Sequence, residues 1–254
     1  MERRHSASLS SVARAELVIG TTIDAFVITC EHGGNRIPAL YQSLFRGQRT
    51  LLGSHRGYDP GALVMARALA KTLNAPVVTS TISRLLVDLN RSIGHPQVFS
   101  PATRGVSAEL RAKIVADHYL PYRTQVERLV RQSVLRGRRV LHISSHSFTP
   151  ELNGKVRSAD VGLLYDPARQ GESALCARWK AALAVLSPQL RVRRNYPYAG
   201  KGDGLTSYLR LRFPRSVYLG IEIEVNQKIV FAAGRRWTAL RNTLIDSLRI
   251  ASAA

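Results

Sequence analysis

Short apolar segments rich in β-branched residues alternate in this chain with longer segments of helical periodicity. The pattern predicts strands at residues 25–30, 77–82, 139–144, 161–165 and 216–225, and helices around residues 61–73, 107–135, 172–186 and 235–251. Pro121 is expected to break or kink the second of these helices. Strands that alternate with helices of ten or more residues favour an α/β fold, with a mostly parallel mixed sheet and helices on both faces.

The 254 residues contain no linker rich in serine, glycine and proline, and a chain of this length can bury one sizeable core. We therefore expect a single domain over residues 21–254, with residues 1–20 as a disordered leader. No apolar run is long enough to span a membrane. The two cysteines lie far apart and fit a reducing compartment, so we expect a cytoplasmic protein.

The chain is strongly basic, with 37 Lys and Arg against 17 Asp and Glu and a formal net charge of +20. Such a charge is typical of proteins that bind nucleic acid. Here, however, the basic residues are spread along the whole chain, and the 7% of aromatic residues do not interleave with the basic runs to make a stacking platform. We therefore do not expect nucleic acid binding, although a basic surface would attract a small anionic substrate.

Polar residues that an ordinary core would not contain stand where several predicted strands end. His32 follows the first strand and precedes two glycines, and His146 follows the third. The carboxyl ends of parallel strands meet at one edge of a sheet, where ligands bind, and two histidines placed there suit a divalent metal. Asp59 is the candidate third ligand, with His55 and Glu31 as alternatives; its other interpretation is the capping residue of the helix that starts at Pro60.

Two further groups of polar and charged residues are expected at this edge. Arg84, Asn90 and Arg91 alternate with apolar residues, and two arginines near a metal can bind a substrate carboxylate or stabilise an oxyanion. Glu222 and Glu224 lie two residues apart in an apolar strand and therefore share a face. A buried carboxylate needs a cation or a raised pKa, and it suits a general base.

Several motifs, taken together and in order, resemble the N-formylglutamate amidohydrolase family over residues 26–230. The matching segments are CEHGGN at 30–35 with Ile37-Pro38, HRGYDPGA at 55–62, SRLLVDLNRS at 83–92, SHSF at 145–148, NYPYAGKGDGLT at 195–206 and EVNQ at 224–227. The stretch Asp88-Leu89-Asn90-Arg91 is also similar to one in zinc carboxypeptidases and aspartoacylases.

The resemblance implies a catalytic domain with a hydrolase fold like that of the zinc carboxypeptidases, and a zinc or other divalent metal cofactor. It implies that His146 is the second histidine ligand, Glu224 the catalytic glutamate, and Asp88 a partner that orients His32. Arg84 and Arg91 would then act in catalysis and, with Asn90, in binding the substrate. The loop at residues 195–206 is expected to close over the substrate and to contribute Asn195, Tyr198 and Thr206.

The implied activity is hydrolysis of the N-formyl or another small N-acyl group of an acidic amino acid such as N-formyl-L-glutamate. At two positions this chain departs from the pattern. The related zinc enzymes have glutamate three residues after the first histidine, where this chain has Asn35, and the formylglutamate hydrolases commonly have arginine where it has Asn226. The alternatives are a hydrolase of a different N-acyl amino acid and a non-catalytic basic binding protein on the same fold.

Overall fold

The computed structural model describes residues 22–232 and 234–253, so the expected leader lies outside the described residues. The strands are β1 (Ala25–Cys30), β2 (Val77–Thr79), β3 (Val140–Phe148), β4 (Glu151–Leu152), β5 (Lys155–Val156), β6 (Val161–Leu164), β7 (Val192–Arg194) and β8 (Tyr218–Asn226). The helices are η1 (Ala39–Phe45), α1 (Arg49–Leu52), α2 (Ala62–Thr72), α3 (Pro101–Arg104), α4 (Ala108–Ile114), η2 (Val115–Tyr119), α5 (Leu120–Leu135), α6 (Gln170–Leu186), α7 (Leu205–Arg210), α8 (Gln227–Phe231) and α9 (Gly234–Ser252).

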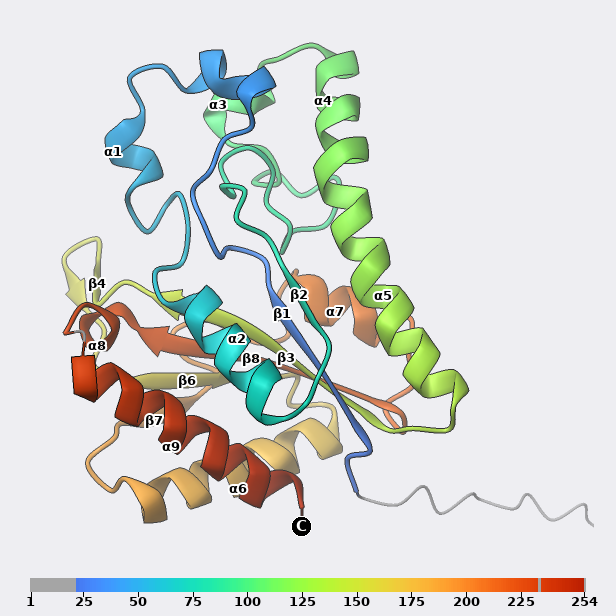
Figure 1. Cartoon of the computed structure of the whole chain (residues 1–254), viewed down its shortest axis with the longest axis vertical. Helices are drawn as coiled ribbons and strands as arrows, with labels where there is room; N and C mark the ends of the chain where they lie inside the picture. The colour runs from blue at the N-terminus through green and yellow to red at the C-terminus, as the bar shows by residue number, and fades with distance from the viewer. Residues whose placement is uncertain (1–21, 233, 254) are drawn as a thin grey trace, which may run out of the picture.

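Within the described residues, six strands form one sheet in the order β2-β1-β3-β8-β6-β7. The strands β2, β1, β3 and β8 run parallel, β6 pairs antiparallel with β8, and β7 runs parallel to β6. Helices α2, α6 and α9 pack on one face and helices α5 and α7 on the other (Figure 1). The expected α/β fold, with a mostly parallel mixed sheet covered on both faces, is confirmed.

The two faces of the sheet differ in chemistry. Residues such as Ile28, Ile143 and Ile221 point into the core under α2, α6 and α9. On the opposite face, Val140 and Tyr218 pack under α5 and α7, and each strand becomes polar towards its carboxyl end. The alternation of side chains along strands produces this division, because residues two apart share a face. The polar ends lie beyond the apolar core and form the candidate site.

Some predicted elements differ in extent. β3 continues to Phe148, so His146 lies within the strand and not in the loop after it. β2 ends at Thr79, and only an isolated bridge at Ile82 continues it. Pro121 does not interrupt the chain's helical course, because it falls in the first turn of α5 directly after the π-helical turn η2. A π-helical turn commonly accommodates such an irregularity within a helix.

The start of α2 also differs from the expectation. Asp59 does not cap this helix; its N-cap residue is Gly61, in a left-handed conformation at φ +82°, and no side chain caps the helix. Val230 packs so closely against Gly61 that a Cβ there would meet it at 2.7 Å. The side chain of Asp59 is therefore available for another role. In the described part of the chain, no helix has the length and apolarity needed to cross a membrane.

Candidate active site

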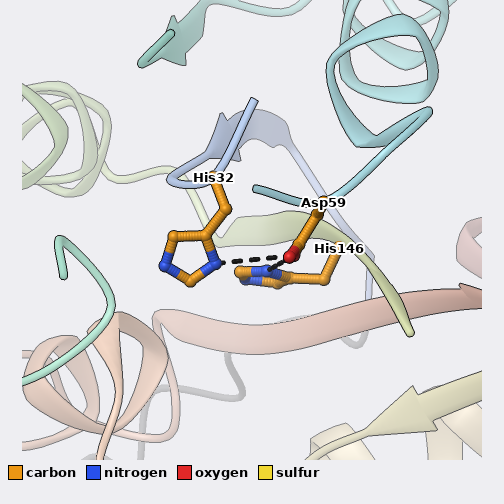
Figure 2. Close-up of side chains that lie close together, drawn as sticks. All are labelled: His32, Asp59 and His146. Carbon is orange, nitrogen blue, oxygen red and sulfur yellow. Dashed lines mark hydrogen bonds and ion pairs between the residues drawn. The ribbon is translucent and has the colours of Figure 1, made fainter. Parts of the chain in front are cut away.

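His32, Asp59 and His146 bring their side chains together at the carboxyl edge of the sheet (Figure 2). Oδ2 of Asp59 lies 3.4 Å from Nδ1 of His32 and 2.9 Å from Nδ1 of His146. One ligand atom from each of the three residues lies within 4.8 Å of the other two, and all three residues are buried. Among the described residues, Nδ1 of His32 has no hydrogen-bond partner. This buried nitrogen aimed at a carboxylate fits a metal site, since two histidines and a carboxylate are a common set of zinc ligands.

The charges in this cluster depend on one another. Burial alone would raise the pKa of Asp59, but the neighbouring His32, His146 and Arg84 hold it well below its ordinary value. Burial would likewise lower the pKa of His146, but its hydrogen bonds to Asp59 and Glu31 raise it well above the ordinary value. The ionised Asp59 is in the form that binds a cation, whereas His146 would have to release a proton to bind one.

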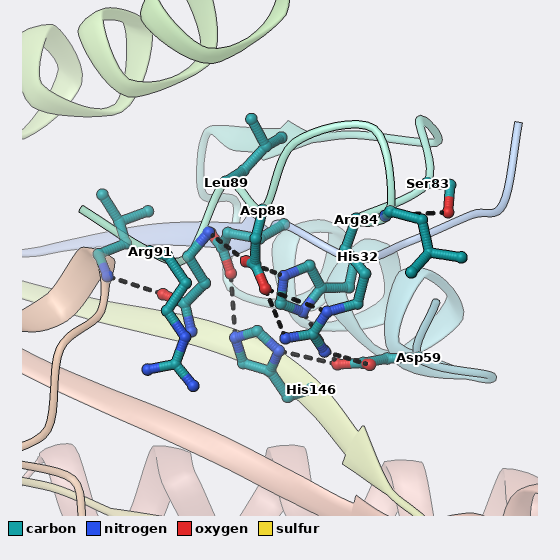
Figure 3. Close-up of polar contacts among 12 residues, drawn as sticks. His32, Asp59, Ser83, Arg84, Asp88, Leu89, Arg91 and His146 are labelled. Atoms are coloured by element: carbon teal, nitrogen blue, oxygen red, sulfur yellow. Dashed lines mark hydrogen bonds and ion pairs between the residues drawn. The ribbon is translucent and has the colours of Figure 1, made fainter. Parts of the chain in front are cut away.

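Asp88 stands behind His32 (Figure 3), with its Oδ1 2.7 Å from Nε2 of the ring. Its other oxygen accepts hydrogen bonds from Nε and Nη2 of Arg84, at 3.2 and 2.7 Å. Arg84 also reaches Asp59 at 3.5 Å. Burial would raise the pKa of Asp88, but Arg84 and His32 keep it well below the ordinary range. Asp88 thus fixes both the ring of His32 and the guanidinium of Arg84.

Glu224 lies on β8 directly across from His146 on β3. It is buried, and its Oε2 has no hydrogen-bond partner among the described residues. Burial raises its pKa to about 8, with Asp59 and Glu222 adding to the rise and His146 and Arg84 opposing it. Glu222 shares the face of Glu224, as expected, and its Oε1 accepts a hydrogen bond from the hydroxyl of Thr206 at 2.7 Å.

These groups open into a cavity of about 210 Å³. Its lining includes His32, His55, Asp59, Arg84, Asn90, Arg91, His146, Tyr198, Asp203, Glu222 and Glu224. Arg91 donates to the carbonyl oxygen of Asp203 at 3.0 Å and, among the described residues, has no ion-pair partner. Asn90 accepts a hydrogen bond from the amide of Leu205 through Oδ1, so its amide hydrogens are the donors left for a ligand. The predicted clustering of polar groups at this edge is therefore found.

Two of the expected substrate contacts are not at this cavity. Oδ1 of Asn195 accepts hydrogen bonds from the backbone of Tyr165 and Gly200, and the hydroxyl of Thr206 is used by Glu222. Neither side chain belongs to the cavity lining. Both positions fall in a segment read from the sequence as one flexible loop, but Asn195 follows β7 and Thr206 already lies in α7. Both residues hold the loop in place. Tyr198, by contrast, does line the cavity.

The remaining sequence candidates are also placed. His55 lines the cavity but does not belong to the cluster of His32, Asp59 and His146. His142, which lies on β3, is fully buried between Thr29 and Tyr218, and burial lowers its pKa to about 4. Asn35, which occupies the position of a glutamate in the related zinc enzymes, is exposed and does not line the cavity. The carboxylate beside the two histidines belongs to Asp59. Asn226 caps α8 and donates to the carbonyl of Ala159.

The contacts that anchor the loop at residues 195–206 could not be predicted from the sequence. Asp203 accepts hydrogen bonds from the amide and the hydroxyl of Ser92, at 2.9 and 2.5 Å. Tyr198 accepts one from Arg157 at 3.1 Å, and Arg157 also stacks on its ring. A single aspartate in a glycine-rich loop reads as a turn residue, so only the folded chain shows this anchor.

Known proteins resemble this chain in sequence and in fold. The family model for N-formylglutamate amidohydrolase matches residues 24–231. A gene product of Agrobacterium tumefaciens of known crystal structure is 30% identical, with a TM-score of 0.77 and coverage of 89% of each chain. An N-formylglutamate amidohydrolase from Ralstonia eutropha is 18% identical, with a TM-score of 0.65 over 91% of this chain and 93% of that one, a likeness of fold.

A metallo-carboxypeptidase from Burkholderia cenocepacia matches more remotely, with 14% identity and a TM-score of 0.36 over 91% of this chain and 56% of that one. This likeness is too low to bear on the chemistry. No functionally curated protein matches this chain.

Proposed function

Because the chain belongs to the N-formylglutamate amidohydrolase family, whose members hydrolyse carbon–nitrogen bonds of linear amides, we propose that it is a metal-dependent amidohydrolase of small N-acyl amino acids. The observation that carries this proposal is the buried cluster of His32, Asp59 and His146 at the floor of a cavity, with Glu224 on the adjacent strand. N-formyl-L-glutamate is the first candidate substrate.

His32, His146 and Asp59 would hold the metal, with zinc as the first candidate because the ligands are two imidazoles and a carboxylate. When bound, such an ion polarises the acyl carbonyl and lowers the pKa of water. The unpartnered Nδ1 of His32 supports this assignment, since a buried nitrogen without a hydrogen bond is costly unless something binds it. Asp88 then keeps the ring of His32 oriented through Nε2.

Glu224 is the proposed general base. Its carboxyl group lies in the cavity with Oε2 unpartnered, so that oxygen is free to take a proton from water and return it to the leaving amine. A pKa of about 8 would leave this carboxyl largely protonated at neutral pH, and a cation bound at the neighbouring cluster would favour the ionised form.

Arg84 and Arg91 are proposed for different tasks because their partners differ. Arg84 is fixed by Asp88 and reaches Asp59, so its guanidinium would lie beside the reacting carbonyl and stabilise the oxyanion. Arg91 has no carboxylate partner among the described residues and lines the cavity with Asn90. These two residues suit the substrate carboxylate, which a guanidinium binds in forked geometry.

A hydrolase of a different N-acyl amino acid is the second candidate, and Glu222 favours it. This carboxylate lines the cavity, and no described cation lies within ion-pair distance of it. It would repel the second carboxylate of N-formyl-glutamate and attract a side chain that donates hydrogen bonds. N-formyl-glutamine is the matched comparison, since it differs from N-formyl-glutamate by one amide.

The test is formate release from a panel of N-formyl amino acids by the wild type, by Glu224→Gln and by Glu222→Gln. We expect the wild type to be active, Glu224→Gln to lose at least 100-fold in kcat as is usual for a general base, and its metal content to stay unchanged. Retained turnover in Glu224→Gln would reassign the base. If Glu222 selects the side chain, Glu222→Gln shifts the ratio of kcat/KM towards N-formyl-glutamate; an unchanged ratio would remove the second candidate.

A further inference from the structure

Glu31 occupies an unusual position for a glutamate. It directly follows β1 and is fully buried, with 0% of its surface exposed. Its Oε1 accepts a hydrogen bond from the hydroxyl of Tyr122 at 2.9 Å, and its Oε2 accepts one from the hydroxyl of Ser144 at 2.6 Å. Oε2 also lies 3.1 Å from Nε2 of His146. Both oxygens are therefore occupied within the protein, so burial leaves no polar atom unsatisfied.

The hydrogen bonds around Glu31 hold the Nε2 edge of the His146 ring. The hydroxyl of Ser144 has a single hydrogen, which it donates to Glu31, so its oxygen can only accept from Nε2 of His146, 2.9 Å away. Nε2 of His146 thus donates to both Ser144 and Glu31. Nδ1 lies at the opposite edge of the ring, 2.9 Å from Oδ2 of Asp59, so it is the nitrogen that would face a metal held by Asp59.

Glu31 cannot itself bind an ion at that position. It lies at the Nε2 edge of His146, whereas Asp59 lies at the Nδ1 edge, 2.9 Å from that nitrogen. Figure 2 shows that the dashed contacts from Asp59 run to one nitrogen of each ring. Of the alternatives considered from the sequence for the third ligand, Glu31 is therefore excluded by its place on the far side of the ring.

His32 has the same arrangement, with Nδ1 towards Asp59 and Nε2 held by Asp88 at 2.7 Å. The two imidazoles are thus matched: each faces Asp59 with Nδ1 and a second carboxylate with Nε2. Glu31 is adjacent to His32 in the sequence, but it supports the ring of His146. Carboxylates behind metal-binding histidines fix the tautomer and the orientation of the ring.

We propose that Glu31, held by Tyr122 and Ser144, is a positioning residue that fixes His146 for metal binding. The inference rests on the proposed metal site of His32, Asp59 and His146. It assigns a role to a buried carboxylate that touches neither the cavity nor the substrate, since Glu31 does not belong to the cavity lining. Its expected effect is on metal affinity and ligand geometry, while contacts with the substrate stay unchanged.

The test replaces Glu31→Gln in the full chain and measures the dissociation constants of Zn²⁺ and Co²⁺ by competition with a chelator. Removing such a carboxylate commonly weakens metal binding by about 10- to 100-fold, and we expect a loss in this range. Asp88→Asn, which alters the carboxylate behind the other histidine, should give a loss of similar size. Glu109→Gln, on the exposed first turn of α4, is the matched control and should bind metal as the wild type does.

Two further readouts separate positioning from a general loss of structure. The visible absorption of the Co²⁺-loaded protein should change in Glu31→Gln, because it reports ligand geometry, and the Nε2 proton resonance of His146 should shift. At saturating metal, KM should stay near the wild-type value while kcat falls. Wild-type affinity and an unchanged Co²⁺ spectrum in a folded Glu31→Gln variant would overturn the inference and leave the proposed function intact.

If the wild type binds no divalent metal, both the proposed function and this inference fail. If Glu31→Gln does not fold, Tyr122→Phe takes its place, since it removes one hydrogen bond from Glu31 and leaves the carboxylate. That variant should weaken Zn²⁺ binding severalfold and shift the same His146 resonance. Tyr122→Phe with wild-type affinity and an unshifted resonance would overturn the inference.

Discussion

Replacing Glu224→Gln should stabilise the metal-free protein at high pH. The pKa of Glu224 is raised from 4.5 to about 8, mainly by burial. A raised pKa means that the neutral carboxyl's contribution to stability is fully present below pH 4.5 and is lost as the pH rises towards 8. At about 1.4 kcal/mol for each pKa unit, the loss approaches about 5 kcal/mol. Glutamine has nearly the same shape and does not ionise, so the variant avoids this loss.

The assay is urea unfolding of the chelator-treated wild type and of Glu224→Gln at several pH values between 5 and 9. The free energies of unfolding should be similar near pH 5 and should diverge in favour of the variant as the pH rises. Glu109→Gln is the control, because Glu109 is exposed and stays ionised across this range. Parallel curves for the wild type and Glu224→Gln would show that burial does not keep this carboxyl neutral.

Three substitutions outside the metal cluster test how the cavity is held. Arg210→Met leaves Glu172 buried without its 3.0 Å ion-pair partner and should lower the free energy of unfolding by about 3–5 kcal/mol in urea denaturation; a change below 1 kcal/mol would contradict this. Asp203→Ala removes both hydrogen bonds to Ser92 and should raise KM in steady-state assays with metal affinity unchanged, whereas an unaltered KM would show that the anchor is dispensable. Gly200→Ala would place a Cβ 2.0 Å from the amide nitrogen of Tyr165, so Tm should fall in a calorimetric scan by the equivalent of about 1–3 kcal/mol; an unchanged Tm would argue against that close approach.

Hydrophobic periodicity was sufficient to predict the central strands and the long helices. The apolar run at β1 and the helical spacing of α2 fell within a residue or two of the structure, because burial on the two faces dictates both patterns. The short strand β7 and helix α7 were missed, since three to six residues carry too little periodicity and their glycine-rich surroundings resemble a loop. The reversed direction of β6 also leaves no trace in its own residues.

The candidate site was predicted in outline because polar residues at strand ends are rare in a core. His32, His146 and Glu224 could be found this way, and the structure places them at one edge. The side-chain partners could not be found, because they depend on contacts between distant segments. Asp59 looked equally suited to cap a helix, and only the structure shows that it does not. Glu31 was an alternative metal ligand, and only the structure shows that it faces Nε2 of His146.

The most direct test of the account measures bound metal and formate release on the same protein samples. We expect the purified wild type to bind about one divalent ion per chain, as a site of three protein ligands implies, to lose activity when the ion is chelated and to regain it when zinc is restored. Asp59→Asn, which weakens the ligand shared by His32 and His146, should reduce bound metal and activity together. Full amide hydrolysis after complete metal removal would contradict the account.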